Sequence, residues 1–428
     1  MVPLNALLGG IEASRLKQAA ASVPEYIRER NLQADKEARS LYESPVKLKG
    51  KRPATAHRNH GVEERLHGIL ERMDRIVTTD FRDLRRGVDY DRTGSIGVQA
   101  LDRKGFFRNV TFDLETPETI DNQIIYAVRL KGVTFNRNEL HREFDLLEAQ
   151  RMGGMQVPAG AVRLDRYIDK EGIVVATPHV NEPLGAEFLD ETTGEARGAK
   201  LCQRKDERVD YPLCWYEYDS QTRPPNGLLL GAMAVGLTSR KRISIGTTIG
   251  ELAERPKKPS PRTGRDDAWR GDVESVFQTY VDRISRLHGG GKGLYHESPH
   301  PGQFHFADGR RNEIIMSDLR NIEPLEEMTY PQKIGCMALD LKSVIIYALR
   351  YDSFPVFGRE GMSFLDMTLK YFNKADGDTL GELRRMAPSS GGRIFEGVFN
   401  LSWENKKPVT FYKSNPLIKA LMQEYPDT

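Results

Sequence analysis

The sequence predicts an α+β fold, and three observations lead to this expectation. From about Asp91, short strand-like runs such as "NQIIYAVRLKG" follow one another. A helix pattern, "NRNELHREFDLLEAQRM", comes next and is followed by two further strand candidates, "GAVRLDRYID" and "GIVVATPHV". Longer helical patterns fill the second half of the chain. Strands, one helix and more strands are typical of an α+β order rather than of repeated βαβ units.

The composition is that of a soluble protein with a sizeable core. The chain has 428 residues, enough for two or three domains or for one two-lobed domain with an extension. Hydrophobic residues make up 39% and charged residues 29%, and the formal net charge of +2 gives no overall signal for nucleic-acid binding. No apolar run approaches the roughly 20 residues of a membrane span. We therefore expect no membrane association.

The expected location is the cytoplasm. The first residues, "MVPLNALLGGIEASR", lack a basic start before their short apolar patch, so we expect no secretory signal. Three cysteines, Cys202, Cys214 and Cys336, have neither metal-type nor redox spacing, and we expect reduced thiols.

The first 92 residues predict an N-terminal helical extension with a basic linker. Residues 11–42 are helical in pattern, and a second helix from Val62 carries an apolar stripe formed by Leu66, Ile69, Leu70, Met73 and Ile76. Between them, "SPVKLKGKRPATAHRNHG" is basic and rich in helix breakers. We interpret this segment as a solvated linker, with a docking arm for an acidic protein partner as the alternative.

The second half predicts helices around a hairpin. Residues 190–250 give no clear assignment, and residues 254–267 form a Pro-rich connector. The hairpin pairs "QFHF" with "EIIMSDL", and a long apolar helix, "KIGCMALDLKSVIIYALRY", follows it. The helix "WRGDVESVFQTYVDRISRLH" comes before the hairpin, and its inward-facing residues are Val273, Val276, Phe277, Tyr280, Val281 and Ile284.

Between that helix and the hairpin lies "GLYHESPHPGQFHF", which concentrates His296, His300 and His305 in a few residues. Imidazole is a common metal ligand, so a metal-binding loop is one interpretation. Pro299, Pro301 and Gly302 interrupt the stretch, so a helix cannot present these histidines on one face.

Taken in order, these segments resemble the protein-kinase-like fold, especially its aminoglycoside-phosphotransferase and small-molecule-kinase branch. That branch has a loop of the form His-Gly-Asp-x-His-x-Gly-Asn, then a hairpin ending in Ile-Asp-Phe/Trp. "HESPHPGQF" and "EIIMSDLRN" are similar in order and spacing. The resemblance covers about residues 93–350. It implies a small β-rich nucleotide-binding lobe at 93–183 and a larger, mainly helical lobe at 184–428, with a catalytic-type loop at 293–320.

The resemblance implies that ATP and Mg²⁺ bind between the lobes. Phosphoryl transfer needs a carboxylate at a strand end and a second oxygen ligand to hold the metal. Asp318 and Gln303 would be those ligands, because a hairpin brings them together. The strand "IIYAVRLKG" resembles the one that carries the phosphate-pairing Lys, which would be Arg129 or Lys131, and Glu143 would pair with it.

Other positions follow from the same resemblance. Gly94 and Gly97 in "TGSIGV" form either a shortened phosphate-covering loop or an ordinary turn. The adenine-binding hinge would lie near Thr177 to Glu182. Asp340 lies where kinases have a structural Asp on a buried helix.

The chain departs from this family at the catalytic position. Ser298 occupies the place of the catalytic Asp, and Ser is no base at neutral pH. Glu297 is adjacent, but in an extended loop it points elsewhere. Two functions therefore compete: an atypical phosphotransferase, or a pseudokinase acting as a structural or regulatory scaffold with protein partners.

Overall fold

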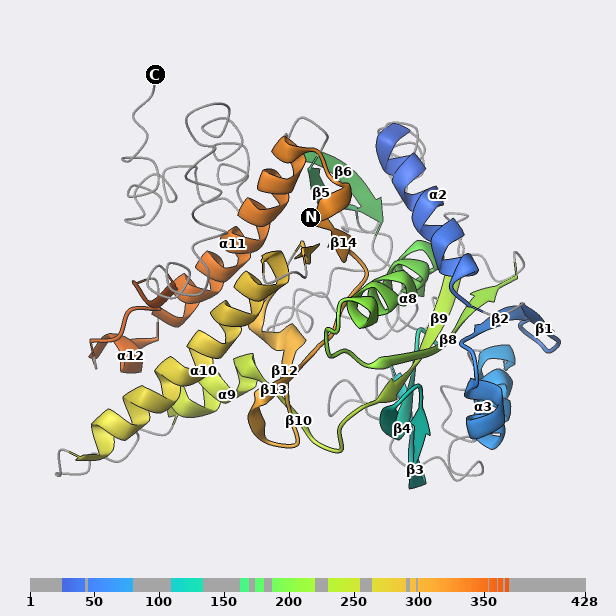
Figure 1. The fold of residues 1–428 in the computed structure, drawn as a ribbon, viewed down its shortest axis with the longest axis horizontal. Helices are drawn as coiled ribbons and strands as arrows, with labels where there is room; N and C mark the ends of the chain where they lie inside the picture. Colours follow the sequence, from blue (N-terminus) through green and yellow to red (C-terminus); the bar gives the residue numbers. More distant parts are fainter. Residues whose placement is uncertain are drawn as a thin grey trace, which may run out of the picture. The chain divides into compact units, whose positions relative to one another are not determined.

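The computed structural model forms two compact units (Figure 1). Unit 1 comprises residues 1–165, 176–200 and 209–240, and unit 2 comprises 166–175, 201–208 and 241–428. The structure describes residues 25–42, 45–79, 109–133, 162–168, 174–180, 187–219, 230–254, 264–289, 293–297, 299–352, 354–359, 361–364 and 366–368.

Unit 1 is built on a seven-stranded sheet in the order β1-β2-β8-β9-β4-β3, with the short β7 also paired to β9. All of its pairs are antiparallel. The β3–β4 hairpin turns at Asp121 and Asn122, which both have positive φ, as a tight two-residue hairpin turn requires. The strands are β1 (Val46–Leu48), β2 (Ala54–Arg58), β3 (Asn109–Ile120), β4 (Gln123–Lys131), β7 (Glu187–Phe188), β8 (Tyr211–Tyr218) and β9 (Leu230–Leu237).

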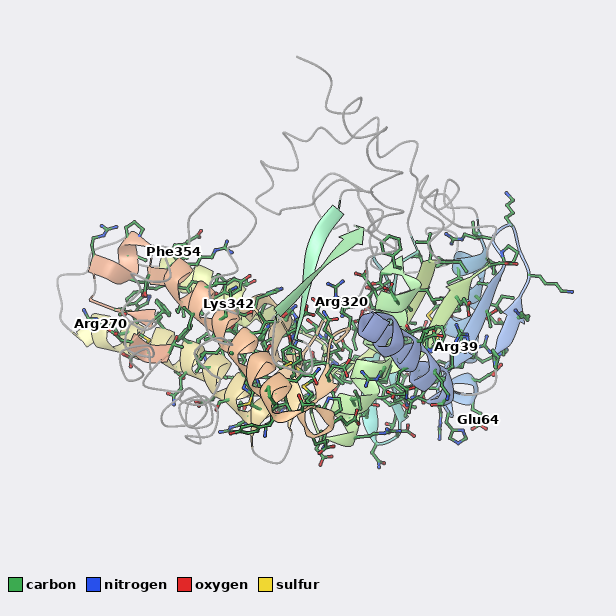
Figure 2. All side chains as sticks on the ribbon, turned by 90° about the horizontal axis from the view of Figure 1, so that it is seen from above. Arg39, Glu64, Arg270, Arg320, Lys342 and Phe354 are labelled. Atoms are coloured by element: carbon green, nitrogen blue, oxygen red, sulfur yellow. The ribbon has the colours of Figure 1, made fainter. Side chains whose placement is uncertain are left out.

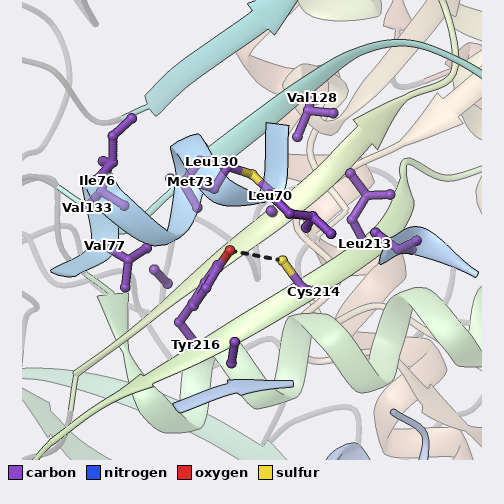
Figure 3. Packing of buried hydrophobic residues seen from close by; sticks show 14 of the residues in the cluster. Leu70, Met73, Ile76, Val77, Val128, Leu130, Val133, Leu213, Cys214 and Tyr216 are labelled. Carbon is purple, nitrogen blue, oxygen red and sulfur yellow. Dashed lines mark hydrogen bonds between the residues drawn. The ribbon is translucent and has the colours of Figure 1, made fainter. Parts of the chain in front are cut away.

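Helices cover both faces of this sheet. Because successive side chains of a strand point to opposite faces, Cys214 and Tyr216 pack with α3 (Val62–Thr78), whereas Trp215 packs on the other face with α2 (Glu25–Ser40) and α8 (Leu189–Arg204). Arg39 of α2 and Glu64 of α3 mark these two helices in Figure 2. Figure 3 shows the α3 side, where the Cys214 thiol lies 3.4 Å from the Tyr216 hydroxyl.

Unit 2 combines helices with short sheets. Strands β10 (Arg242–Ser244), β12 (Phe304–Ala307) and β13 (Arg310–Met316) form a three-stranded sheet, and β11 (Leu294–Tyr295) pairs with β14 (Glu323–Pro324). Its helices are α9 (Ile245–Glu254), α10 (Gly264–His288), α11 (Tyr330–Asp352) and α12 (Pro355–Arg359), with one-turn 3₁₀ segments η3 (Pro301–Gln303) and η4 (Leu325–Glu327). The pair β5 (Val162–Ile168) and β6 (Val174–Val180) forms a separate two-stranded sheet.

Aromatic side chains form the core of unit 2. The apolar stripe of α10 is fully buried, as its spacing predicts. Phe277 of that stripe lies edge-on to Phe364 at 4.9 Å between ring centroids, and Tyr280 packs on Phe304 at 5.6 Å. The contact between Tyr280 and Phe304 packs α10 against the hairpin that carries the site described below.

Several expectations from the sequence are confirmed. The chain is α+β, and the predicted helices at α3, α10 and α11 and the β12–β13 hairpin are present. The helix predicted over residues 11–42 is described as α2, from residue 25 onward. No described helix is long and apolar enough to cross a membrane. None of the three cysteines forms a disulfide.

The predicted basic linker is wrong in its structure. Its residues form the β1–β2 hairpin at the edge of the unit 1 sheet. Ala54, Ala56 and His57 are buried there, so the segment belongs to the folded core and is not a solvated linker. The expected three-part division also differs from the observed one. Unit 1 includes the N-terminal helices and continues to Arg240, since β8 and β9 lie in the middle of its sheet.

Candidate functional site

Lys131 is held by a carboxylate at the end of β4. Its ammonium lies 2.5 and 2.6 Å from the two carboxylate oxygens of Glu195 on α8. Burial alone would lower the pKa of Lys131, but the charges of Glu195 and Glu187 outweigh it, so the pKa is raised. Lys131 is therefore a firmly charged cation with 20% of its side chain exposed.

Arg129 lies two residues earlier on the same strand and therefore on the same face. Its guanidinium donates to the carboxylate of Asp210 at 2.9 Å. Each cation predicted to contact phosphate is thus paired with a carboxylate from outside β4. Glu143, predicted as the partner of this cation, lies outside the described residues, and in the described part of the chain Lys131 pairs with Glu195.

The loop after α10 is fixed through its backbone. The amide of His296 donates to Asp340 Oδ2 at 3.0 Å, and His288 Nε2 lies 2.9 Å from the same oxygen. Asp340 is fully buried on α11, as the sequence predicts. Next to His296, Glu297 has φ +78°, a left-handed conformation uncommon outside Gly. The loop therefore turns sharply at the position before Ser298.

His300 caps the 3₁₀ segment that ends the loop. Its Nδ1 accepts a hydrogen bond from the Gly302 amide at 3.1 Å, and its own amide donates to Gln303 Oε1 at 3.0 Å. Burial lowers the pKa of His300, so the imidazole is neutral at pH 7 and Nδ1 can accept. This reciprocal cap holds the Gln303 side chain in one place.

Gln303 and Asp318 meet across the β12–β13 hairpin, as the sequence predicts. Gln303 Nε2 donates to Asp318 Oδ2 at 2.6 Å, and the Ser317 amide donates to the Gln303 carbonyl at 2.9 Å. Asp318 follows the end of β13 with φ +59°. The open end of the hairpin therefore brings together an amide just before β12 and a carboxylate just after β13.

These two side chains fit a magnesium site by their chemistry. Mg²⁺ binds oxygen ligands and is usually held by one or two carboxylates, water and phosphate. Asp318 offers a carboxylate. The Gln303 oxygen accepts one hydrogen bond from His300, and an amide oxygen has two acceptor positions.

The three histidines have separate surroundings. His305 Nε2 lies 3.1 Å from Ser317 Oγ, His300 caps η3, and the His296 ring packs against Phe304 at 5.9 Å between centroids. Within the described part of the chain, no group of three or more His, Cys, Asp or Glu side chains is arranged to hold a metal ion.

Some predicted site residues remain untested. Gly94, Gly97, Glu182 and Ser298 lie outside the described residues. Thr177 lies within β6. Sequence reasoning missed Glu195, although the acidic and basic residues of "LDETTGEARGAKLCQR" could have indicated a helix there.

Comparisons with known proteins add little to this geometry. No family model matches the sequence, and no curated protein matches it. A solved structure described as "Glucosamine kinase (crystal form B)" shares 10% sequence identity over 83% of this chain and 86% of its own, with a TM-score of 0.28. A TM-score this low supports no conclusion about fold or function.

Proposed function

We propose that this chain binds an ATP-type nucleotide together with Mg²⁺, as an atypical or degenerate kinase-like protein. The observation that carries the proposal is the contact between Gln303 and Asp318 at the end of the β12–β13 hairpin. It brings together a carboxylate and an amide side chain, the two ligand types with which protein kinases hold the metal on the phosphates. In this structure the amide nitrogen of Gln303 faces Asp318, so the Gln303 oxygen would have to turn toward the carboxylate to share a metal with it.

The Lys131–Glu195 pair supports the same function. Protein kinases need a strand Lys that contacts the phosphates and is held by a helix Glu. Lys131 at the end of β4 and Glu195 on α8 form a pair of this type. In the proposed complex Lys131 contacts phosphate oxygens while Glu195 keeps its ammonium in place.

The charge around Lys131 supports a requirement for a divalent cation. Arg129 and Lys131 contribute +2, whereas Glu187, Glu195 and Asp210 contribute −3, so this cluster has a formal charge of −1. A triphosphate approaching it meets net repulsion. Mg²⁺ bound together with the nucleotide would supply the charge that neutralises the phosphates.

We expect the chain to bind nucleotide but to transfer its phosphoryl group slowly or not at all. The residue at the usual catalytic position is Ser298, and a serine hydroxyl does not take up a proton at neutral pH. This residue favours the second candidate function, a nucleotide-responsive scaffold. Phosphoryl transfer at a useful rate would require a base from another position, for which Glu297 is the adjacent carboxylate.

Calorimetry with ATP, with and without Mg²⁺, tests the proposal. We expect Mg²⁺-dependent binding by the wild type and a loss of at least about tenfold in affinity for Asp318→Asn, which removes a charged ligand. Asp272→Asn is the matched control, because Asp272 is an exposed carboxylate of the same unit paired with Arg311. Absence of ATP binding by a folded wild type would refute the proposal.

A further inference from the structure

The N-terminal segment contacts α8 at three positions. Glu37 of α2 pairs with Arg197 Nε at 2.5 Å, the Tyr42 hydroxyl donates to the Ala196 carbonyl at 3.3 Å, and Lys200 Nζ donates to Asn59 Oδ1 at 2.5 Å. All three lie in unit 1. They fall on the turn and a half of α8 that follows Glu195.

The contacts are partly or fully shielded from water. Arg197 has only 7% of its side chain exposed, and Tyr42 and Ala196 share an apolar cluster with Ala38 and Trp215. The ammonium of Lys200 lies over the rings of Tyr42 and Tyr211, at 5.5 and 5.9 Å from their centroids. An ion pair shielded in this way constrains its helix more than an exposed surface pair does.

The segment is itself anchored to the sheet. Arg39, labelled in Figure 2, pairs with Glu217 of β8 at 2.9 Å and lies over the Trp215 ring. The side-chain amide of Asn59 donates to the Tyr211 hydroxyl at 2.7 Å, and its backbone amide donates to the Leu213 carbonyl at 2.8 Å. The described parts of this segment, residues 33–42 and 45–59, therefore both connect α8 to β8 by polar contacts.

This connection matters because of what the sheet and the helix carry. Strand β8 pairs with β9, which pairs with β4 and hence with Lys131. Helix α8 carries Glu195. The same sheet therefore positions both partners of the ion pair. Lys131 is positioned by the neighbouring strands, and Glu195 by the contacts of α8 with the N-terminal segment.

We propose that residues 33–42 and 45–59 act as an internal clamp that positions Glu195 against Lys131. Glu37, Tyr42 and Asn59 are its positioning residues. The consequence for nucleotide affinity rests on the proposed function, whereas the effect on the Lys131–Glu195 pair does not.

A charge exchange between Glu37 and Arg197 tests the clamp without any nucleotide. The variants are Glu37→Arg, Arg197→Glu and the double exchange, with Lys36→Glu as the control, since Lys36 is an exposed charge of the same helix. The readouts are the rate of Lys131 acylation by an amine-directed reagent and hydrogen exchange of residues 189–200, both followed by mass spectrometry.

We expect each single reversal to speed both readouts about tenfold, because displacing Glu195 exposes Lys131 and removes the charge that keeps it protonated. The double exchange restores both toward wild-type rates, and Lys36→Glu leaves them unchanged. A folded Glu37→Arg protein with wild-type labelling and exchange would overturn the proposal, and so would a double exchange as fast as the single variants.

Two further measurements separate the outcomes. If the reversals do not fold, Tyr42→Phe and Glu37→Gln remove one contact each with little change in shape, and the same acceleration is expected at smaller amplitude. If the double exchange restores Lys131 protection but the wild type does not bind ATP, the clamp stands and the proposed function fails.

Discussion

Lys131 and Glu195 form a two-point ion pair between the end of β4 and a covering helix, with 20% and 13% of their side chains exposed. Because water solvates both side chains poorly, removing either partner would lower the free energy of unfolding. The pair is therefore a structural element of unit 1 as well as a proposed phosphate contact.

Replacing Glu195 by Gln tests the structural part of this statement. The substitution leaves a largely buried ammonium without its counter-charge, and we expect the free energy of unfolding to fall by about 1–3 kcal/mol. Glu64→Gln on the outer side of α3 is the control and should change stability by less than about 0.5 kcal/mol. Equal stability of the two variants in urea denaturation would show that the pair contributes nothing.

Asp340 is predicted to hold the loop at His296. Asp340→Ala removes the acceptor of the His296 amide and the partner of His288, and should cost about 3–5 kcal/mol as a broken buried network. The His296 amide should also lose its protection from hydrogen exchange. Ser343→Ala, one turn further along α11, should leave that protection in place. Retained protection in a folded Asp340→Ala protein would contradict the assigned contact.

Acid should loosen the contact between α2 and the sheet. His57 and Arg39 lower the pKa of Glu217 to about 2: His57 Nε2 lies 3.9 Å from the carboxylate, and Arg39 donates to it directly at 2.9 Å. A carboxyl group with a lowered pKa stabilises the fold above its ordinary pKa, near 4.5, and this contribution is lost as the pH falls toward 2. Unfolding curves should therefore show a smaller acid-dependent loss for Glu217→Gln than for the wild type over this interval.

His300 should give a second, separate pH dependence. Burial lowers its pKa from the ordinary 6.5, so the folded protein holds fewer protons than the unfolded chain just below that pH. Its contribution to stability is complete above about 6.5 and declines as the pH falls through the lowered value. His300→Asn keeps an acceptor for the Gly302 amide without titrating. Identical pH profiles for this variant and the wild type would contradict the role of His300.

The sequence was most informative where local pattern decides structure. The apolar stripe of α10 and the β12–β13 hairpin follow from spacing alone, and the hairpin in turn brings Gln303 to Asp318. The apolar stripe of a helix and the pairing of a hairpin both depend on residues close together in the sequence, so no long-range contact is needed to predict them.

The partner of Lys131 could not be predicted in this way. Helix α8 packs small residues such as Ala196 and Ala199, and therefore shows no apolar stripe. Strands β8 and β9 are buried on both faces, so they lack the alternation that marks a half-exposed strand. The carboxylate and the cation come from segments 64 residues apart and meet only when the sheet is complete.

Protection of Lys131 by nucleotide is the most direct test of Mg²⁺-dependent ATP binding, because Lys131 is the proposed phosphate contact. We predict that Mg²⁺ with ATP slows acylation of Lys131 at least about tenfold in the wild type, that ATP without Mg²⁺ protects much less, and that Asp318→Asn abolishes the difference. Unchanged Lys131 labelling in a folded wild type at millimolar Mg²⁺ and ATP would contradict the account.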